Sequence, residues 1–237
     1  MHVKTKAIVI SATRYREKSL IVKCFTELYG LKSFYVRDAF SGKKNGQKNS
    51  YFQPLTLLTI VATNKNKDSL EYFKEIKIFH PYLSIDKNIV KTTIVLFLSE
   101  VFNYCIQEEE KNERLYNFIE TSLIWLDSHD DAADFHLILL LEITKYLGFY
   151  PSIPVRESAF FEMSAGIFTD IETPTCLSAS QTLLLRKLIF LKFNESKNSF
   201  HQKERHIILK ILLDYYSIHL DGFRKPKSIE VLKEVFM

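Results

Sequence analysis

Lysine, arginine and tyrosine side chains are interleaved in the first 51 residues, and this group is the best suited in the sequence to bind a polyanion. Lys and Arg release counterions when they contact phosphates, and aromatic rings stack on unpaired bases. Flexible Lys side chains contact phosphates without reading base edges, so the predicted binding is independent of base sequence. The predicted nucleic-acid contacts are Arg14, Lys18, Lys23, Arg37, Lys43, Lys44, Lys48, Tyr35 and Tyr51.

Two other interpretations of this basic group stay open. It could be a solvated surface with no partner, or it could bind an acidic protein, which would make the chain a non-enzymatic interaction scaffold. The neighbouring Phe34 and Phe52 are expected in the core, whereas Tyr35 and Tyr51 could face either solvent or the core. Binding to DNA of unrelated sequences that weakens steeply with salt would separate these alternatives.

A second polar group, His129, Asp130, Asp131, Asp134 and His136, has residue types that bind metal ions. It lies where a helix is expected to begin, and Asp is favoured there because exposed backbone N–H groups and the helix dipole stabilise a carboxylate. We therefore expect Asp134 to cap the helix, and we expect no metal. The alternative is a hydrolase that uses this group, which requires metal-dependent turnover.

Common catalytic motifs are absent from the sequence. The six glycines form no G-x-G-x-x-G, no G-K-[ST] follows a glycine-rich loop, and there is no G-x-S-x-G. Cys24 lies in an expected strand and Cys105 on an apolar helix face, where a thiol is buried and unreactive. We therefore predict that the protein is not an enzyme and has no cofactor.

Composition predicts a folded protein with unevenly distributed charge. The chain has 237 residues, of which 46% are hydrophobic, and a net charge of +4, so disorder as a class is excluded. Residues 1–78 hold 15 basic and 6 acidic side chains, a net charge of +9, whereas residues 79–237 hold 17 and 22, a net charge of −5. Three scattered cysteines, no signal peptide pattern and no apolar run of membrane length predict a cytoplasmic protein without a membrane segment.

Hydrophobic alternation predicts five strands in the first 80 residues, near 7–10, 20–25, 31–36, 52–63 and 70–79. Five strands in so short a segment suit a small closed β-barrel, because closure leaves no exposed sheet edge. Residues 41–50 are polar and are expected to form a loop between two of the strands.

From residue 84 on, apolar residues recur at helical spacing. Helices are expected at 89–106, 114–126, 134–146, 180–193, 201–220 and 229–236, and Gly148 is expected to end the third. Residues 149–179 carry three prolines and many small polar residues, so they are expected to form an irregular insert with a short hairpin at 160–168. We predict an α+β protein with two domains, a five-stranded barrel at 1–80 and an all-helical domain, apart from the insert, at 81–237.

Several short motifs occur in an order that resembles one bacterial family. They are residues 7–10 (AIVI), 15–22 (YREKSLIV), 25–32 (FTELYGLK), 36–39 (VRDA), 52–55 (FQPL), 134–136 (DFH), 145–151 (KYLGFYP) and 228–232 (SIEVL). With these motifs the chain resembles the RecO family of DNA repair and recombination mediators, and the likeness spans most of its length.

The resemblance implies an N-terminal OB-fold, a helical C-terminal domain and a non-catalytic role at the nucleoid. It implies that the chain binds single- and double-stranded DNA, anneals complementary strands, acts with RecR, and helps load RecA on strands coated by single-stranded DNA-binding protein (SSB). It also implies contact with the acidic, apolar C-terminal tail of SSB, which needs an apolar pocket with a basic rim. The cations considered for that rim are Arg114, Lys145, Arg186 and Lys187.

The insert departs from the family pattern at the position of a zinc module. Many members have four cysteines there, whereas residues 152–180 contain only Cys176, and residues 156–159 read RESA where the first cysteine pair is expected. One cysteine cannot form a four-coordinate structural zinc site. We therefore predict that the insert holds no metal and is stabilised by packing of Phe160, Phe161, Ile167 and Phe168.

Overall fold

The structure is a computed structural model that describes residues 2–37, 39, 50–63, 70–107, 110–130, 132–153, 157–195 and 199–236. The chain divides into two compact units, Met1–Ser128 and His129–Met237. The predicted DNA contacts Lys43, Lys44 and Lys48 lie outside the described residues.

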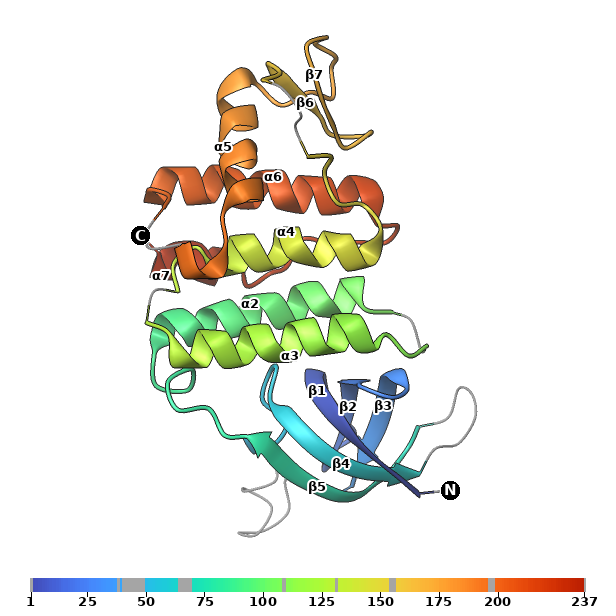
Figure 1. Ribbon diagram of the computed structural model, residues 1–237. Coiled ribbons are helices and arrows are strands. Elements are labelled where there is room, and N and C mark those ends of the chain that lie inside the picture. Colours follow the sequence, from blue (N-terminus) through green and yellow to red (C-terminus); the bar gives the residue numbers. More distant parts are fainter. Residues whose placement is uncertain are drawn as a thin grey trace. The chain divides into compact units, whose positions relative to one another are not determined.

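The first unit contains a five-stranded antiparallel sheet in the order β3-β2-β1-β4-β5 (Figure 1). The strands are β1 (His2–Tyr15), β2 (Ser19–Thr26), β3 (Gly30–Val36), β4 (Leu57–Thr63) and β5 (Phe73–His80). All five predicted strands are confirmed, although β4 begins later than expected. Leu55 has a φ of 54°, a left-handed backbone that an extended strand cannot include, so β4 begins beyond it.

The prediction of a closed barrel is wrong as to closure, because the sheet stays open between its edge strands β3 and β5 in the described part of the chain. An isolated parallel bridge joins Phe34 to Glu71. The Tyr35 amide donates to the Glu71 carbonyl at 2.8 Å, and the Glu71 amide donates to the Ser33 carbonyl at 3.0 Å. Since Glu71 precedes the first residue of β5, this pairing stops where the strand begins and does not extend into a ladder.

Alternating residues of the strands form one apolar core inside the curved sheet. Phe34 and Phe52 are both buried in it, as predicted. Their rings stack on Phe73, with centroid distances of 4.2 Å and 5.8 Å. Cys24 lies in the same core, and burial raises the pKa of its thiol far above the ordinary value. Cys24 is therefore a core residue, as its position in the sequence indicates.

Two helices, α2 (Ile89–Cys105) and α3 (Glu113–Ser128), complete the first unit and lie side by side (Figure 1). Lys6 of β1 donates to Glu120 of α3 at 2.7 Å and so joins the sheet to the helices. Along the chain, the boundary between the units lies between Ser128 and His129. Both helices therefore belong to the same unit as the sheet. The predicted domain boundary between residues 80 and 81 stays a prediction, because a compact unit can contain more than one folding domain.

Asp127, at the end of α3, holds the segment that links β5 to α2. Its carboxylate accepts hydrogen bonds from the amides of Leu83, Ser84 and Ile85 at 2.9, 2.9 and 3.0 Å. Burial opposes ionisation of Asp127, but these hydrogen bonds outweigh it and lower the pKa of the carboxyl. The fully buried Lys91 of α2 donates to the Ser84 hydroxyl at 2.6 Å. These contacts thus hold the segment between β5 and α2 against both helices.

The second unit consists of helices and one short hairpin. Its elements are α4 (Phe135–Leu147), β6 (Phe160–Glu162), β7 (Ile167–Thr169), α5 (Ala179–Phe190), the short 3-10 helix η1 (Phe193–Glu195), α6 (Gln202–His219) and α7 (Ile229–Val235). Within this unit, α4 and α6 run alongside each other and α5 crosses them (Figure 1). Gly148 has a φ of 86° and ends α4, as predicted.

The hairpin of β6 and β7 confirms the strands expected in the insert, so the second unit is mainly helical rather than all-helical. Across the described ranges, no helix is both long enough and apolar enough to cross a membrane.

Candidate nucleic-acid interface

The turn between β1 and β2 carries predicted basic residues into solvent. Arg14, Arg16 and Lys18 are all exposed. Arg16 has a φ of 56°, and Arg14 Nη2 donates to the Glu17 carbonyl at 3.0 Å across the turn. Arg14 lies at the end of β1, and Arg16 and Lys18 lie in the turn that follows it.

Arg37 lies beside that turn, because Val36 of β3 pairs with Leu20 of β2 and Arg37 follows Val36. Arg37 is exposed. We call Arg14, Arg16, Lys18 and Arg37 the basic turn cluster. It gathers four cations from two strand ends at one end of the sheet.

Lys23 is less accessible than the basic turn cluster. It lies in the middle of β2 and is half-buried, and its Nζ is 3.5 Å from Oδ1 of Asn103 in α2. The Ser11 hydroxyl is 3.5 Å from the same oxygen. Lys23 therefore points toward α2 within the first unit, and contact with a phosphate would compete with Asn103.

The two predicted aromatic contacts occupy different surroundings. Tyr35 is half-buried and points away from the core, since its neighbours Phe34 and Val36 are buried in that core. Its hydroxyl is hydrogen-bonded to the Ser19 hydroxyl at 2.8 Å. Tyr51 is also half-buried but packs against the core of the sheet. Of the two, Tyr35 is the better placed to meet a ligand.

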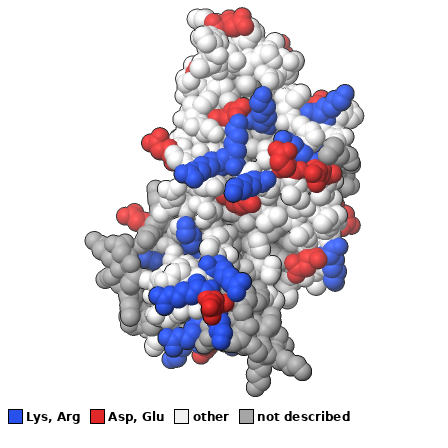
Figure 2. Space-filling model, turned by 180° about the vertical axis from the view of Figure 1, so that it is seen from behind, with Lys and Arg blue, Asp and Glu red and all other residues white. Residues whose placement is uncertain are grey.

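Basic side chains predominate over the sheet on the face shown in Figure 2. Three further lysines of the first unit, Lys4, Lys74 and Lys77, are exposed on β1 and β5. The sequence analysis did not select them, although alternation along β5 places Lys74 away from the apolar Phe73. These lysines contribute to the net charge of +9 in residues 1–78, and that charge was the sequence signal that pointed to them.

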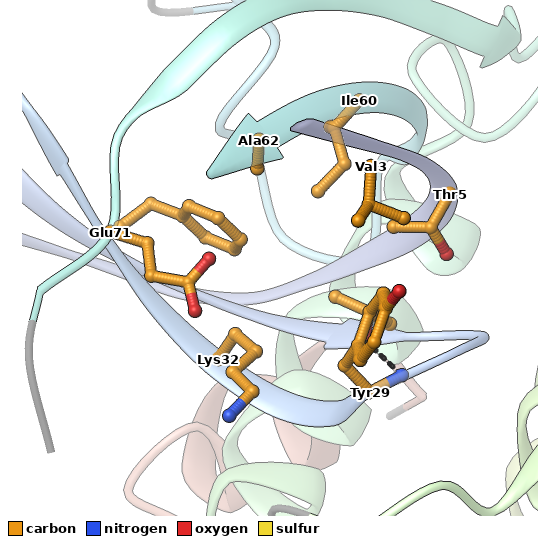
Figure 3. Close-up of a pocket in the computed structure, with 9 residues that line it drawn as sticks. Val3, Thr5, Tyr29, Lys32, Ile60, Ala62 and Glu71 are labelled. Carbon is orange, nitrogen blue, oxygen red and sulfur yellow. Dashed lines mark hydrogen bonds between the residues drawn. The ribbon is translucent and has the colours of Figure 1, made fainter. Parts of the chain in front are cut away.

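A small cavity lies beside the turn between β2 and β3 (Figure 3). Val3, Thr5, Ile60 and Ala62 line it, with Lys32 among the other residues around it, and its volume is about 10 Å³. A cavity of that size holds about one water molecule. It is therefore not a site for a nucleotide or a cofactor.

Asp134 does not cap α4 with its side chain, contrary to the prediction. It occupies the N-cap position, but its carboxylate accepts from the Ser199 amide at 2.8 Å and lies 3.5 Å from Arg205 Nη1. Burial raises the pKa of Asp134 despite these favourable contacts. The sequence could not foresee this role, because both partners are more than 60 residues away along the chain.

His136 is buried in the first turn of α4. Burial lowers the pKa of its imidazole to about 3, and the charges of Arg205 and His206 act in the same direction. Among the residues that the structure describes, no three His, Cys, Asp or Glu side chains are placed to hold a metal ion together. Asp131 lies outside the described residues. In this unit Asp134 and His136 serve helix packing.

Aromatic packing holds the insert, so the prediction for this segment is confirmed in part. Phe161 is fully buried, and its ring lies 5.0 Å from Phe168 and 5.9 Å from Tyr215 of α6. Phe160 is half-buried, but Ile167 is 47% exposed, so the prediction that it packs was wrong. Ile167 pairs with Glu162 on the side of the hairpin away from Phe161.

Three of the four cations considered for a partner-binding rim already interact within the second unit. Lys145 Nζ lies 2.6 Å from Glu142, Arg186 Nη2 donates to the Ser158 carbonyl at 2.6 Å, and Lys187 donates to the Ser199 carbonyl. Arg114 is exposed on α3, in the first unit. Most of the cations predicted for the rim are therefore already held by hydrogen bonds or an ion pair within the second unit.

A groove in the second unit instead combines apolar walls with other cations. It lies between α6 and α7 and has a volume of about 590 Å³. Its lining includes the apolar residues Ile207, Leu209, Leu213 and Ile229 and the cations Lys210, Lys225 and Lys233. Lys225 pairs with Asp214 at 2.6 Å and Lys233 with Glu230 at 2.9 Å. Lys210 lies on α6, Lys233 on α7 and Lys225 in the segment between them, and their spacing in the sequence did not reveal that the fold brings them together.

A basic five-stranded sheet unit followed by a mainly helical unit defines an α+β protein of two units, whose basic surface suits a polyanion. Comparison with known proteins identifies the family. Residues 1–82 match the family described as "Recombination protein O N terminal", and residues 86–155 match "Recombination protein O C terminal". The chain therefore belongs to the RecO family of DNA repair proteins.

Curated relatives support this assignment over the full length. The chain is 60% identical over 236 residues to the DNA repair protein RecO of Flavobacterium johnsoniae, with 100% of each chain covered. It is 60% identical over 237 residues to that of Flavobacterium psychrophilum, again with 100% of each covered. It is 39% identical over 238 residues to that of Christiangramia forsetii, with the same coverage of both chains.

Proposed function

We propose that this protein is a non-enzymatic mediator of homologous recombination that binds single- and double-stranded DNA at the nucleoid and anneals complementary strands. With RecR, it helps to load RecA on single strands that SSB covers. Membership in the RecO family supports the role in DNA repair. The observation that carries DNA binding is the basic turn cluster, four exposed cations at one end of the sheet.

The basic turn cluster suits phosphates rather than base edges. Its members extend from strand ends into solvent, so they can follow a flexible backbone without a fixed geometry. Each Lys or Arg that neutralises a phosphate releases counterions, which favours binding at low salt. Annealing follows from the same chemistry, because two strands that repel each other approach more easily once cations neutralise part of their charge.

The groove between α6 and α7 supports a contact with the C-terminal tail of SSB. Such a tail is acidic and apolar, and the groove offers apolar walls with Lys210, Lys225 and Lys233 around them. Lys210 is exposed on α6, so a carboxylate can reach it without displacing an ion pair that involves Lys225 or Lys233. We propose this groove as the site, with RecR binding elsewhere on the chain.

The thiols support a role without nucleophilic catalysis. Cys24 and Cys105 are buried, and desolvation raises the pKa of both far above the ordinary value, so neither forms a thiolate near neutral pH. Cys176 is only partly buried, and its sulfur accepts a hydrogen bond from the Thr173 amide at 3.4 Å.

A salt series of DNA binding tests the proposal. Labelled single strands of two unrelated sequences and a duplex are titrated with the full chain at increasing salt. We expect binding to all three, with an affinity that falls linearly in log–log form. Absence of DNA binding at low salt, together with salt-dependent binding of an acidic protein, would instead support the scaffold alternative.

A further inference from the structure

Three tyrosines form a row at the same end of the sheet as the basic turn cluster. The rings of Tyr15 and Tyr35 lie 6.1 Å apart between centroids at 84°, and those of Tyr35 and Tyr72 lie 5.8 Å apart at 78°. These edge-to-face contacts stabilise each ring against its neighbour. We call these three residues the tyrosine row.

The strand pairing explains why the row forms. Tyr15 pairs with Ser19, and the Ser19 hydroxyl is hydrogen-bonded to the Tyr35 hydroxyl at 2.8 Å. The bridge around Glu71 then places Tyr72 beside β3. Tyr35 is thus fixed in the centre by pairing on both sides, and it supports the two outer rings.

The outer rings are accessible. Tyr72 is 49% exposed and Tyr15 is 37% exposed. The helix α2 covers the sheet nearer Ser11 and Lys23, where Asn103 reaches both, and the row lies beyond that cover. An exposed pair of rings on a fixed support resembles the surfaces on which unpaired bases stack.

Positive charge surrounds the row. The Arg16 guanidinium lies 5.2 Å from the centre of the Tyr15 ring, and Lys18 and Arg37 flank the same strand ends. Phosphates of a single strand can therefore lie on these cations while its bases meet the rings. Duplex DNA cannot do this without unpairing, because its bases are stacked on each other and only its backbone is offered to a surface.

We propose that the tyrosine row is a platform for unpaired bases, with Tyr15 and Tyr72 as the stacking residues and Tyr35 as a positioning residue. The inference rests on the proposed DNA binding. It adds a reason why the protein would bind single strands more tightly than duplex DNA. The cations then bind any DNA, and the tyrosines discriminate single-stranded from double-stranded DNA.

Three ligands of equal length separate base stacking from phosphate binding: a 20-nucleotide oligothymidine, the same backbone without bases, and a duplex. Affinities of the full chain are measured by fluorescence anisotropy at one salt concentration. One stacked base corresponds to a factor of about 5 to 150 in affinity. We expect oligothymidine to bind at least about fivefold more tightly than the abasic strand.

The double variant Tyr15→Ala/Tyr72→Ala is expected to bring that ratio to about one while leaving the abasic and duplex affinities unchanged. Tyr72→Phe retains the ring and should retain the ratio. Phe79→Ala is the matched control, because Phe79 is 40% exposed on β5 but lies outside the row, and it should change none of the three affinities.

Equal wild-type affinity for oligothymidine and the abasic strand would overturn the inference, as would a double variant that keeps the ratio. A double variant that loses all three affinities by the same factor would also overturn it, since the tyrosines would then act through the fold. If wild-type protein bound no DNA at all, the proposed function itself would fail. That result differs from the others because the abasic strand and duplex would also be unbound.

Discussion

The two units of the chain hold their cations in different ways. In the first unit, Arg16, Lys18 and Arg37 lie at strand ends and extend into solvent. In the second, lysines on helix surfaces are paired with nearby carboxylates, as in Lys145 with Glu142 at 2.6 Å and Lys233 with Glu230 at 2.9 Å. The cations of the basic turn cluster are therefore available for a polyanion, whereas these helix lysines are already neutralised.

The difference shows that the carboxylates around a cation matter as well as the number of cations. Residues 1–128 hold 19 Lys and Arg and 14 Asp and Glu, a net charge of +5, whereas residues 129–237 hold 13 and 14, a net charge of −1. A cation paired with a carboxylate must give up that pair before it can release counterions from a phosphate. Helices bring acidic and basic residues three apart onto one face, whereas a tight β-turn separates them and exposes each one.

The largest effect is expected from breaking a buried contact in the second unit. Asp134→Ala leaves the Ser199 amide and the Arg205 guanidinium without the carboxylate that they share. We expect a loss of about 3 kcal/mol in the free energy of unfolding, measured by urea denaturation of the full chain. Asp134→Asn should lose less, because burial already favours the neutral acid and the amide oxygen still accepts.

DNA affinity of the folded Asp134→Ala variant should equal that of the wild type. If the substitution weakened DNA binding at a temperature where the chain is folded, the cations of the second unit would belong to the DNA site and the contrast between the units would fail.

A slightly smaller effect is expected from neutralising the exposed cations. Arg16→Gln/Lys18→Gln/Arg37→Gln removes three phosphate contacts, which should lower affinity for single-stranded DNA by about 100-fold at 0.1 M salt. The log–log salt slope should become shallower by about 2. The matched control Lys145→Gln/Lys225→Gln/Lys233→Gln changes the net charge equally. A comparable loss in the control would show that total charge, rather than its location, determines binding.

Mild acid should affect the second unit through His136. Burial lowers the pKa of this imidazole from 6.5 to about 3, so the unfolded chain takes up the proton first. The stability that the neutral ring contributes is present above about pH 6.5 and is lost as the pH falls toward 3. By pH 5 the expected loss is about 2 kcal/mol.

His136→Gln should remove most of this pH dependence, whereas substitution of the exposed His129 should not. An unchanged pH dependence in His136→Gln would assign the acid sensitivity to another group.

Local pattern was sufficient to predict the elements that build both units. Alternation located β2 and β3 closely, and helical spacing located α2, α4 and α6, because each pattern reflects burial on one side of the element itself. Closure of the sheet could not be predicted in this way. It depends on whether β3 meets β5 along its length, and within the described residues the two edges are joined only by the bridge between Phe34 and Glu71.

The candidate site was predictable only where its residues are neighbours in sequence. Arg14, Arg16 and Lys18 are close neighbours in the chain, at the end of β1 and in the turn after it, so the sequence revealed them as a group. The tyrosine row joins Tyr15, Tyr35 and Tyr72 through strand pairing and a single bridge, and sequence spacing does not encode such a contact. Asp134 occupies the predicted N-cap position, but the sequence did not reveal the partners of its side chain, because they come from α6 and the segment before it.

The smallest effect on stability is expected at a surface ion pair. This pair tests whether a paired cation of the second unit takes any part in DNA binding. Lys145→Met keeps the apolar stem but removes the charge that faces Glu142 at 2.6 Å in α4. Because an exposed pair three residues apart contributes little, the free energy of unfolding should fall by less than about 0.5 kcal/mol. DNA affinity should be unchanged within error, measured beside the basic-turn variants in the same salt series. A measurable loss of DNA affinity would mean that Lys145 exchanges its carboxylate for a phosphate, so that cations paired in the free protein also serve the bound state.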